Sequence, residues 1–217
     1  MAEPSDLRAI RTAYDTVAVE YAEILRAELA ARPVDRAMLT AFAELVQAAG
    51  ARPVADIGCG PGRVTGYLHE LGVTCFGIDL SPVMLALARR AYPALRFGEG
   101  SMSALGLADA ALGGIVAWYS IIHTPPSRLP DVFAEFCRAL RPGGYLLLAF
   151  QAGDDVVHLE QAYGHAVSLD AYRLQPGLVC GLISQAGLSV LARLVREPCE
   201  SEKTQQAYLL ARKPAQS

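Results

Sequence analysis

The stretch over residues 54–65 constrains the fold of this chain more than any other part of the sequence. An apolar run is followed there by three glycines within five residues, Gly58, Gly60 and Gly62, and then by an amphipathic run. This order predicts a buried strand, a tight turn and the first turn of a helix. Glycine accepts positive φ and lets a ligand approach the main chain, and a helix start offers unpaired N–H groups. Because nucleotide-like ligands bind at such turns in open α/β sheets, the stretch also predicts a binding site.

The residues of the turn narrow the choice of ligand. A pyrophosphate-binding turn has glycine at the last position of G-x-G-x-x-G, where this chain has Arg63. Pro61 stiffens the turn and removes one backbone donor. We therefore favour a ligand without a phosphate at the turn, such as a nucleoside that carries an amino-acid tail. A turn with no ligand is the alternative, although three glycines so close together weaken a fold unless something uses the space.

A second informative residue, Asp79, follows the next predicted strand, residues 74–78. It comes about 20 residues after the glycine turn, where a carboxylate accepts hydrogen bonds from ribose hydroxyls. The alternative is that it caps the next helix, but Ser81 and Pro82 already supply an N-cap and a first helical residue. Asp79 therefore predicts a ribose-bearing ligand without separating a nicotinamide cofactor from another nucleoside.

Composition argues against several other classes of protein. With 217 residues, of which 53% are hydrophobic, one domain is expected rather than two. The net charge of -3 and the lack of a basic run argue against nucleic acid as a partner. The sequence shows no signal peptide and no apolar stretch of membrane length, so we expect a cytoplasmic protein with no membrane partner. An odd number of cysteines without paired spacing predicts reduced, mostly buried thiols and no metal site; they are Cys59, Cys75, Cys137, Cys180 and Cys199.

The rest of the chain alternates predicted strands and helices. Helical patterns cover residues 7–31 and a second helix that ends at Gly50. Later strands are expected at residues 95–97, 114–120 with a continuation over 121–123, 145–150, 188–195 and 206–212, the last two as an antiparallel pair. Residues 151–173 have an irregular pattern and are long for a loop in a compact domain, so we expect them to be partly helical or functional.

Two tyrosines stand out in the N-terminal helical pattern. Tyr14, Ala18 and Tyr21 fall on one helical face, at spacings of four and three residues. The tyrosines either dock the helix on the rest of the domain or close over a bound ligand, and the pattern alone does not separate the two.

Taken in order, these motifs resemble those of the class I S-adenosylmethionine-dependent methyltransferases. The matching pieces are the tyrosine pair, the glycine turn, the Asp79 segment, an Ala-Trp-Tyr-Ser strand end and a Leu-Arg-Pro-Gly-Gly turn, at residues 14–21, 56–62, 77–84, 117–120 and 140–147. The resemblance covers nearly the whole chain. The stretch 117–126 is similar to a subgroup of small bacterial methyltransferases of unassigned substrate.

The resemblance implies an α/β fold of the Rossmann-like, doubly wound kind. Its sheet would have seven strands in the order 3-2-1-4-5-7-6, with strand 7 antiparallel and helices on both faces. One methyltransferase domain would fill residues 1–217, with an N-terminal helical cap over about 5–31 and an acceptor-side segment over about 151–173. Its cofactor would be S-adenosyl-L-methionine, which leaves as S-adenosyl-L-homocysteine.

The resemblance also assigns residues to the parts of the cofactor. The glycines would approach its methionine part, the aromatic pair of the fourth strand would lie near the sulfonium, and the two tyrosines would cover it. Asp79 would take both ribose hydroxyls, and Leu80 and Met84 would flank the adenine. Many family members have an acid where Ser101 stands, so Ser101 or main-chain groups would serve instead. The implied cofactor-binding residues are Tyr14, Tyr21, Gly58, Cys59, Gly60, Asp79, Leu80, Met84, Ser101, Met102, Trp118 and Tyr119.

The chemistry itself requires few side chains. Methyl transfer is an in-line displacement at a carbon on sulfur, so positioning and the exclusion of water supply most of the catalysis. A general base is needed only if the acceptor is protonated at the working pH. His123, which follows the fourth strand, is the candidate base; alternatively it orders the adjacent Pro-Pro turn. His158, Tyr163 and His165 are candidates for the acceptor pocket, or are ordinary exposed residues.

The methyl acceptor is expected to be a small molecule, and the protein a monomer or homodimer. The chain has no Asn-Pro-Pro-Tyr-type motif suited to amino groups of DNA or glutamine, and no added nucleic-acid module. Three rival functions stay open. They are a nicotinamide-dependent Rossmann oxidoreductase, against which Arg63 argues, a non-catalytic S-adenosylmethionine-binding protein and a protein methyltransferase.

Overall fold

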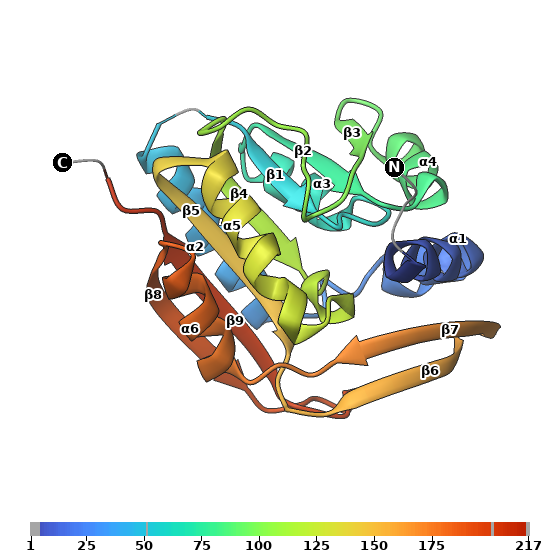
Figure 1. The fold of residues 1–217 in the computed structure, drawn as a ribbon. Helices are drawn as coiled ribbons and strands as arrows, with labels where there is room; N and C mark the ends of the chain where they lie inside the picture. The colour runs from blue at the N-terminus through green and yellow to red at the C-terminus, as the bar shows by residue number, and fades with distance from the viewer. Residues whose placement is uncertain (1–4, 51, 201, 216–217) are drawn as a thin grey trace.

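A seven-stranded mixed sheet forms the centre of the described part of the chain, which comprises residues 5–50, 52–200 and 202–215 of a computed structural model. Its strands lie in the order β3-β2-β1-β4-β5-β9-β8 (Figure 1). Their bounds are β1 Val54–Ile57, β2 Cys75–Asp79, β3 Arg96–Glu99, β4 Leu112–Trp118, β5 Leu140–Gln151, β8 Ser189–Arg196 and β9 Gln206–Arg212. The first five pair in parallel, whereas β9 runs antiparallel to both of its neighbours.

This sheet confirms the fold class expected from the sequence. The predicted order 3-2-1-4-5-7-6 becomes 3-2-1-4-5-9-8 because the chain inserts two further strands, β6 and β7, before the last pair. The strands predicted at residues 54–57 and 206–212 coincide with β1 and β9. β5 is longer than predicted, since Leu140 already pairs with Leu112 before the Pro-Gly-Gly stretch.

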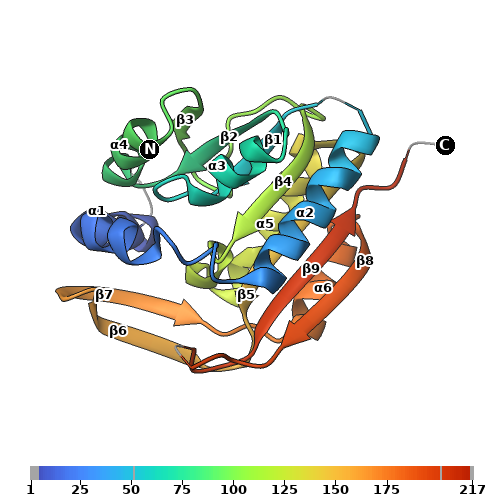
Figure 2. The same cartoon turned by 180° about the vertical axis from the view of Figure 1, so that it is seen from behind.

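Helices cover both faces of the sheet. α2 (Pro33–Ala48) and α3 (Arg63–Glu70) pack on one face, and α5 (Leu129–Ala139) and α6 (Pro176–Gln185) pack on the other, as Figure 1 and Figure 2 show from opposite sides. α4 (Pro82–Ala91) packs with β3 and with α1 (Ser5–Leu25). Because helices cover it on both sides, the central part of the sheet is buried on both faces.

β4 shows how the sequence positions side chains at the end of a buried strand. Ile115 and Ala117 pack on the α5–α6 side, while Val116 and Trp118 pack on the α2–α3 side. This alternation follows from the period of two in a strand. β4 therefore delivers an aromatic side chain to the edge where the parallel strands end.

Residues 151–173 differ most from expectation. They contain an antiparallel hairpin apart from the main sheet, β6 (Val156–Ala162) and β7 (His165–Tyr172), so the partly helical alternative is wrong. Tyr163 and Gly164 form its turn with φ of 52° and 83°, the left-handed pair that one common two-residue hairpin turn requires. β7 lies beside α1 (Figure 1). The alternate burial of Leu169 and Ala171 matches a period of two, which is the signal that the sequence carried for a strand.

The chain turns sharply where β4 ends. Tyr119 has φ of 55°, a left-handed conformation that stops the strand, and Ile121–His123 form the short 3-10 helix η1. The strand continuation predicted over residues 121–123 is therefore wrong. A second such turn, η2, covers Pro126–Arg128. The N-terminal helix likewise ends at Leu25 and turns follow to residue 31, so the cap expected over about 5–31 is helical only in its first part.

The cysteines are free, and their burial varies. Cys59 is buried, Cys199 is exposed and the other three lie between, so the expectation of mostly buried thiols holds only in part. Within residues 5–50, 52–200 and 202–215, no group of three or more His, Cys, Asp and Glu side chains gathers as metal ligands do. In the same part of the chain, no helix combines the length and apolar character needed to cross a membrane.

Candidate cofactor-binding and active site

A cavity opens at the carboxyl ends of β1, β2 and β4, where α1 covers it. The space between its lining atoms is about 640 Å³, a volume that includes open solvent. The candidate base His123 lies in its lining. So do nine of the twelve predicted cofactor residues: Tyr14, Tyr21, Gly58, Gly60, Asp79, Leu80, Met102, Trp118 and Tyr119. The fold therefore brings into one cavity residues that lie far apart in the sequence.

The glycine turn has the conformation that only glycine adopts readily. Gly58, Gly60 and Gly62 have φ of 71°, 52° and 84°. A Cβ on Gly58 would stand 2.3 Å from the Cβ of Ser120, so no side chain fits there. A Cβ on Gly60 would meet only the Tyr21 ring, at 3.8 Å. The turn is thus packed on one side and offers open backbone to the cavity on the other.

Asp79 is held at the cavity by the backbone. One carboxylate oxygen accepts the N–H of Gly60 at 2.7 Å, and the other accepts the N–H of Ser81 at 2.8 Å. Burial raises the pKa of Asp79, and these backbone donors oppose the rise. Since each carboxylate oxygen has further lone pairs, the fixed carboxylate can still accept two hydroxyl groups.

Helix α4 begins at the same place. Ser81 is its N-cap, because the Ser81 hydroxyl accepts the N–H of Met84 at 3.0 Å, as the sequence predicted. The same hydroxyl donates to Asp15 of α1. The cap therefore fastens the covering helix to the cofactor side of the cavity.

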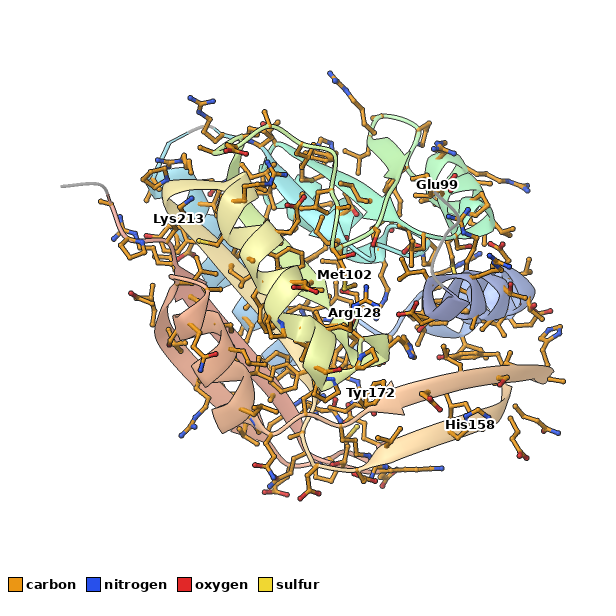
Figure 3. All side chains as sticks on the ribbon, in the orientation of Figure 1. Glu99, Met102, Arg128, His158, Tyr172 and Lys213 are labelled. Carbon is orange, nitrogen blue, oxygen red and sulfur yellow. The ribbon has the colours of Figure 1, made fainter. Side chains whose placement is uncertain are left out.

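Polar contacts anchor α1 along its length. Arg11, which is part of the cavity lining, pairs with Glu99 at 2.6 Å, and Asp6 pairs with Arg128 at 3.0 Å. Figure 3 shows Glu99 and Arg128 on separate elements that face α1. The two predicted tyrosines therefore line the cavity on a helix that polar contacts dock to the domain. Docking the helix and facing a ligand are compatible roles for this pair.

Arg63 explains why the turn lacks a phosphate-binding glycine. Its guanidinium pairs with Glu28 at 2.7 Å and hydrogen-bonds the hydroxyl of Tyr21. Tyr21 in turn packs against Tyr14 and against Tyr163 of the hairpin turn, at ring-centre distances of 5.8 and 5.2 Å. The Arg63 side chain thus stands where a pyrophosphate-binding turn has glycine, and it is held by Glu28 and Tyr21.

His123 has a partner on each ring nitrogen. Its Nδ1 lies 2.8 Å from the backbone oxygen of Asp170 on β7, and its Nε2 lies 2.7 Å from the hydroxyl of Tyr14. A carbonyl oxygen only accepts, so Nδ1 carries the proton and Nε2 accepts the Tyr14 O–H. Burial lowers the pKa of His123 below its ordinary value, against the opposing effect of the Asp170 carbonyl. The contacts of the imidazole lie on α1 and β7, not on the adjacent Pro-Pro turn.

The three residues predicted for the acceptor pocket lie outside the lining of this cavity. His158 is half exposed on the hairpin, where its Nδ1 lies 2.7 Å from the carboxylate of Asp170 (Figure 3). His165 lies 3.1 Å from the carboxylate of Glu20 on α1. Tyr163 packs against Tyr21, which is part of the lining.

Three predicted cofactor residues also lie behind the lining. The Cys59 thiol is buried against β2 and β3, near Gly77 and Phe97, and burial raises its pKa. Met84 is buried within the core. The Ser101 hydroxyl bonds that of Ser103 at 3.0 Å.

Sequence reasoning missed six residues of the lining. Two carried a usable signal: Arg11 precedes Tyr14 by three positions on the same helical face, and Ser81 is the helix cap next to Asp79. The full set missed is Ile10, Arg11, Ile57, Ser81, Gly100 and Ser120.

Asp56 is a buried acid beneath the turn. One of its oxygens accepts the Thr65 hydroxyl at 2.6 Å, which ties α3 to β1, while the other has no partner among the described residues. Burial raises the pKa of Asp56 to about 7. The acid is therefore partly protonated near neutrality.

Comparison with known proteins gives the family. A family model described as a methyltransferase domain matches residues 54–144, which contain the turn, Asp79 and His123. The malonyl-[acyl-carrier protein] O-methyltransferase of Enterobacter lignolyticus is 34% identical over 160 residues, which cover 74% of this chain and 60% of that relative. These matches support the class I S-adenosylmethionine-dependent methyltransferase family for this chain, with a methyltransferase domain at residues 54–144. The chain spans about 60% of the length of this curated relative.

Two solved structures share the fold over nearly the whole chain. The 1,6-didemethyltoxoflavin-N1-methyltransferase of Burkholderia thailandensis, which contains 1,6-didemethyltoxoflavin and S-adenosylhomocysteine, has a TM-score of 0.71 at 21% identity, covering 99% of this chain and 92% of that one. The [4+2]-cyclase SpnF has a TM-score of 0.71 at 16% identity, covering 100% and 98%. At such identities the likeness shows the fold alone, and the fold does not fix the reaction.

The cavity fits S-adenosylmethionine, the cofactor of this family. Gly60 leaves open backbone for the amino-acid part, and Asp79 presents a fixed carboxylate for the ribose. Arg63 stands where a pyrophosphate-binding turn has glycine, and its guanidinium is paired with Glu28 and Tyr21. These features favour S-adenosylmethionine over a nicotinamide cofactor.

Proposed function

We propose that this chain is a methyltransferase that transfers the methyl group of S-adenosylmethionine, in line, to a small molecule. The single observation that carries the proposal is the cavity, in which the Asp79–Gly60 corner and the Tyr14–His123 pair lie under one covering helix. The cofactor would supply the electrophilic methyl carbon. Every other requirement of an in-line displacement is one of position and of the exclusion of water.

The residues of the chain divide into three tasks. Asp79 and the glycine turn bind and orient the cofactor through its ribose and amino-acid parts. Tyr14 and Tyr21 of α1 exclude water from above. His123 and Tyr14 face the remaining space, where an acceptor would bind. In this proposal residues 5–31 act as the cap and residues 151–173 support it from the acceptor side, through the Asp170 carbonyl and Tyr163.

A small acceptor suits a cavity that a helix covers. An extended polypeptide would need an open groove beside the methyl group, whereas here α1 is fastened by Asp15, Arg11 and Asp6. The Enterobacter lignolyticus relative acts on an acyl group carried by a protein, and the Burkholderia thailandensis enzyme on a nitrogen of a free heterocycle. Both reacting groups are small, so we propose a small reacting group here, free or carried.

A non-catalytic or differently catalytic binder of the same cofactor is the second candidate. The observation that favours it is that a [4+2]-cyclase has this fold over the whole chain. Such a protein would bind S-adenosylmethionine and release no S-adenosylhomocysteine.

The proposal is tested by calorimetric titration followed by a turnover screen. Binding of S-adenosylmethionine, and S-adenosylhomocysteine release that depends on an added acceptor, is the expected result. Heat on binding without turnover across a panel of phenols, heterocyclic amines, carboxylates and acyl thioesters would support the second candidate. No heat at all, with heat on titration of reduced nicotinamide cofactor, would overturn both.

A further inference from the structure

We infer that Tyr14 and His123 form a proton relay in which the Tyr14 oxygen touches the acceptor, so that the acceptor reacts through an O–H or N–H group. This inference rests on the proposed function and deepens it, because it names the chemical class of the acceptor. It also moves the direct contact with substrate from the imidazole to the phenol.

The two hydrogen bonds of His123 have a defined direction. The Asp170 carbonyl, 2.8 Å from Nδ1, fixes the proton of His123 on that nitrogen. Nε2 is therefore a bare acceptor, and the hydroxyl 2.7 Å away must donate to it. The Tyr14 oxygen then has its lone pairs left, and Tyr14 lies in the cavity lining. A group that binds there can donate a proton to Tyr14 but cannot receive one from it.

The pair acts as a proton relay because Tyr14 remains a neutral phenol and does not ionise to a phenolate. Tyr14 is partly buried, and desolvation together with the charges of Tyr21, Tyr163 and Asp79 raises its pKa well above the ordinary value. Tyr14 therefore stays protonated and can only pass a proton on. His123 faces Tyr14 and the Asp170 residue of β7, and burial keeps it neutral, which leaves Nε2 free to take the proton.

Bonds, protons and charge balance during methyl transfer through this relay. The acceptor O–H or N–H bond breaks, its proton goes to the Tyr14 oxygen, and the Tyr14 proton goes to Nε2. The electron pair left on the acceptor forms the bond to the methyl carbon, while the carbon–sulfur bond breaks with its pair remaining on sulfur. One positive charge thus leaves the sulfonium as one appears on the imidazolium, so the buried cavity gains no net charge. His123 later returns its proton to solvent.

The acceptor class follows from this balance. A hydroxyl or ring N–H that is still protonated near neutral pH needs such a relay, whereas a carboxylate is ionised already and needs none. A carboxylate would also find no hydrogen-bond donor in Tyr14 and His123, because the Tyr14 proton is directed at Nε2 of His123. We therefore expect phenolic, enolic or heterocyclic N–H acceptors.

The first experiment needs no acceptor. Histidine labelled with ¹⁵N is observed by NMR in the protein saturated with S-adenosylhomocysteine, and the His123 signals are identified by their loss in His123→Gln. We expect the Nδ1–H tautomer, with an Nε2 signal that moves in Tyr14→Phe and stays in the control Tyr67→Phe. Tyr67 is a suitable control because its hydroxyl bonds Thr40 at 3.3 Å on another face. An Nε2–H tautomer, or a signal indifferent to Tyr14→Phe, would overturn the relay.

The second experiment compares two sets of acceptors. Tyr14→Phe and His123→Gln should each slow methylation of phenols and ring N–H compounds by at least about 100-fold, and the double variant should be no slower than the worse single one. For acceptors that are already ionised, such as 4-nitrophenolate, the loss of turnover should be at least about tenfold smaller, because these acceptors have no proton to hand over. His69→Gln on α3 serves as the matched histidine control.

Each remaining outcome has a defined meaning. Equal losses on both sets of acceptors would show a structural role and overturn the relay. Methylation of carboxylates alone, or cofactor binding with no turnover of any acceptor, would overturn the acceptor class. A protein that does not bind S-adenosylmethionine would fail the proposed function itself, which the titration reveals before any acceptor is added.

Discussion

The two walls of the cavity are held in different ways. On the cofactor wall, made of the glycine turn and Asp79, backbone groups do the holding: Asp79 accepts N–H bonds from Gly60 and Ser81. On the acceptor wall, made of α1, η1 and the hairpin β6–β7, side chains from distant segments hold one another. There Tyr14 and His123 meet across 109 positions of sequence.

The difference shows where each wall gets its specificity. A backbone cradle serves a ligand shared by a whole family, because it depends on glycine conformation and one carboxylate. A wall of side-chain pairs can be rebuilt for another acceptor by exchanging a few residues. We therefore expect substitutions in the cofactor wall to reduce stability or cofactor affinity more than matched substitutions in the acceptor wall.

The sharpest contrast is between two glycines with positive φ. Gly58→Ala should destabilise the protein by about 3 kcal/mol or more, since its Cβ would stand 2.3 Å from that of Ser120 at a φ of 71°. Gly164→Ala in the hairpin turn has φ of 83° but nothing within 4 Å, so about 1 kcal/mol is expected. Urea unfolding measures both. Equal losses of unfolding free energy in the two variants would show that the two walls do not differ in this respect.

The pH dependence of stability should also come from the cofactor wall. Because the native pKa of Asp56 is raised to about 7 from 3.8, the native state holds this proton more tightly than the unfolded chain. Stability should therefore fall as pH rises from about 4 to about 7, by up to about 1.4 kcal/mol per pH unit. Asp56→Asn should flatten this slope in urea unfolding at a series of pH values. If the variant keeps the wild-type dependence of unfolding free energy on pH, a group other than Asp56 causes that dependence.

A third comparison uses two aspartates. Asp79→Asn should weaken S-adenosylhomocysteine binding at least about tenfold, because one backbone N–H would then face an amide N–H₂ and the ribose would lose an acceptor. Asp170→Asn keeps the backbone carbonyl that holds His123. The carboxylate itself bonds His158 outside the cavity, so cofactor affinity should stay within about twofold. Calorimetry measures both. If only Asp170→Asn weakened S-adenosylhomocysteine binding, the hairpin side and not the Asp79 side would be the cofactor wall.

The smallest effect is expected where the hairpin meets α1. His165 and Glu20 lie 3.1 Å apart, but both side chains are substantially exposed. His165→Ala should therefore change the free energy of unfolding by less than about 1 kcal/mol. A loss of several kcal/mol would mean that this contact, and not the tyrosine cluster, docks the hairpin.

The sequence predicts the cofactor wall well because its signals are local. The glycine spacing, Asp79 and the Ser81 cap each depend on a few neighbouring residues and on intrinsic backbone preferences. Of these residues, Gly58, Gly60, Asp79 and Ser81 line the cavity, together with Tyr14 and Tyr21.

The acceptor wall was not predictable to the same degree. His123 was chosen by its place after β4. Its partners, Tyr14 and the Asp170 carbonyl, lie on α1 and on a hairpin that the sequence did not predict, although both segments were expected at the acceptor site. His158 and His165 were chosen only because they fall in a long segment, and the strand pairing turns them to the outside. Contacts between distant elements depend on how the elements dock, which periodicity does not report.

The most direct test of the central claim is a crystal structure of the protein with S-adenosylhomocysteine. The account predicts the ribose hydroxyls on the Asp79 carboxylate, the amino-acid part against Gly60, and the sulfur facing Tyr14 and His123 beneath α1. Cofactor bound elsewhere, or an Asp79 carboxylate that contacts only Gly60 and Ser81 at saturating ligand, would contradict it.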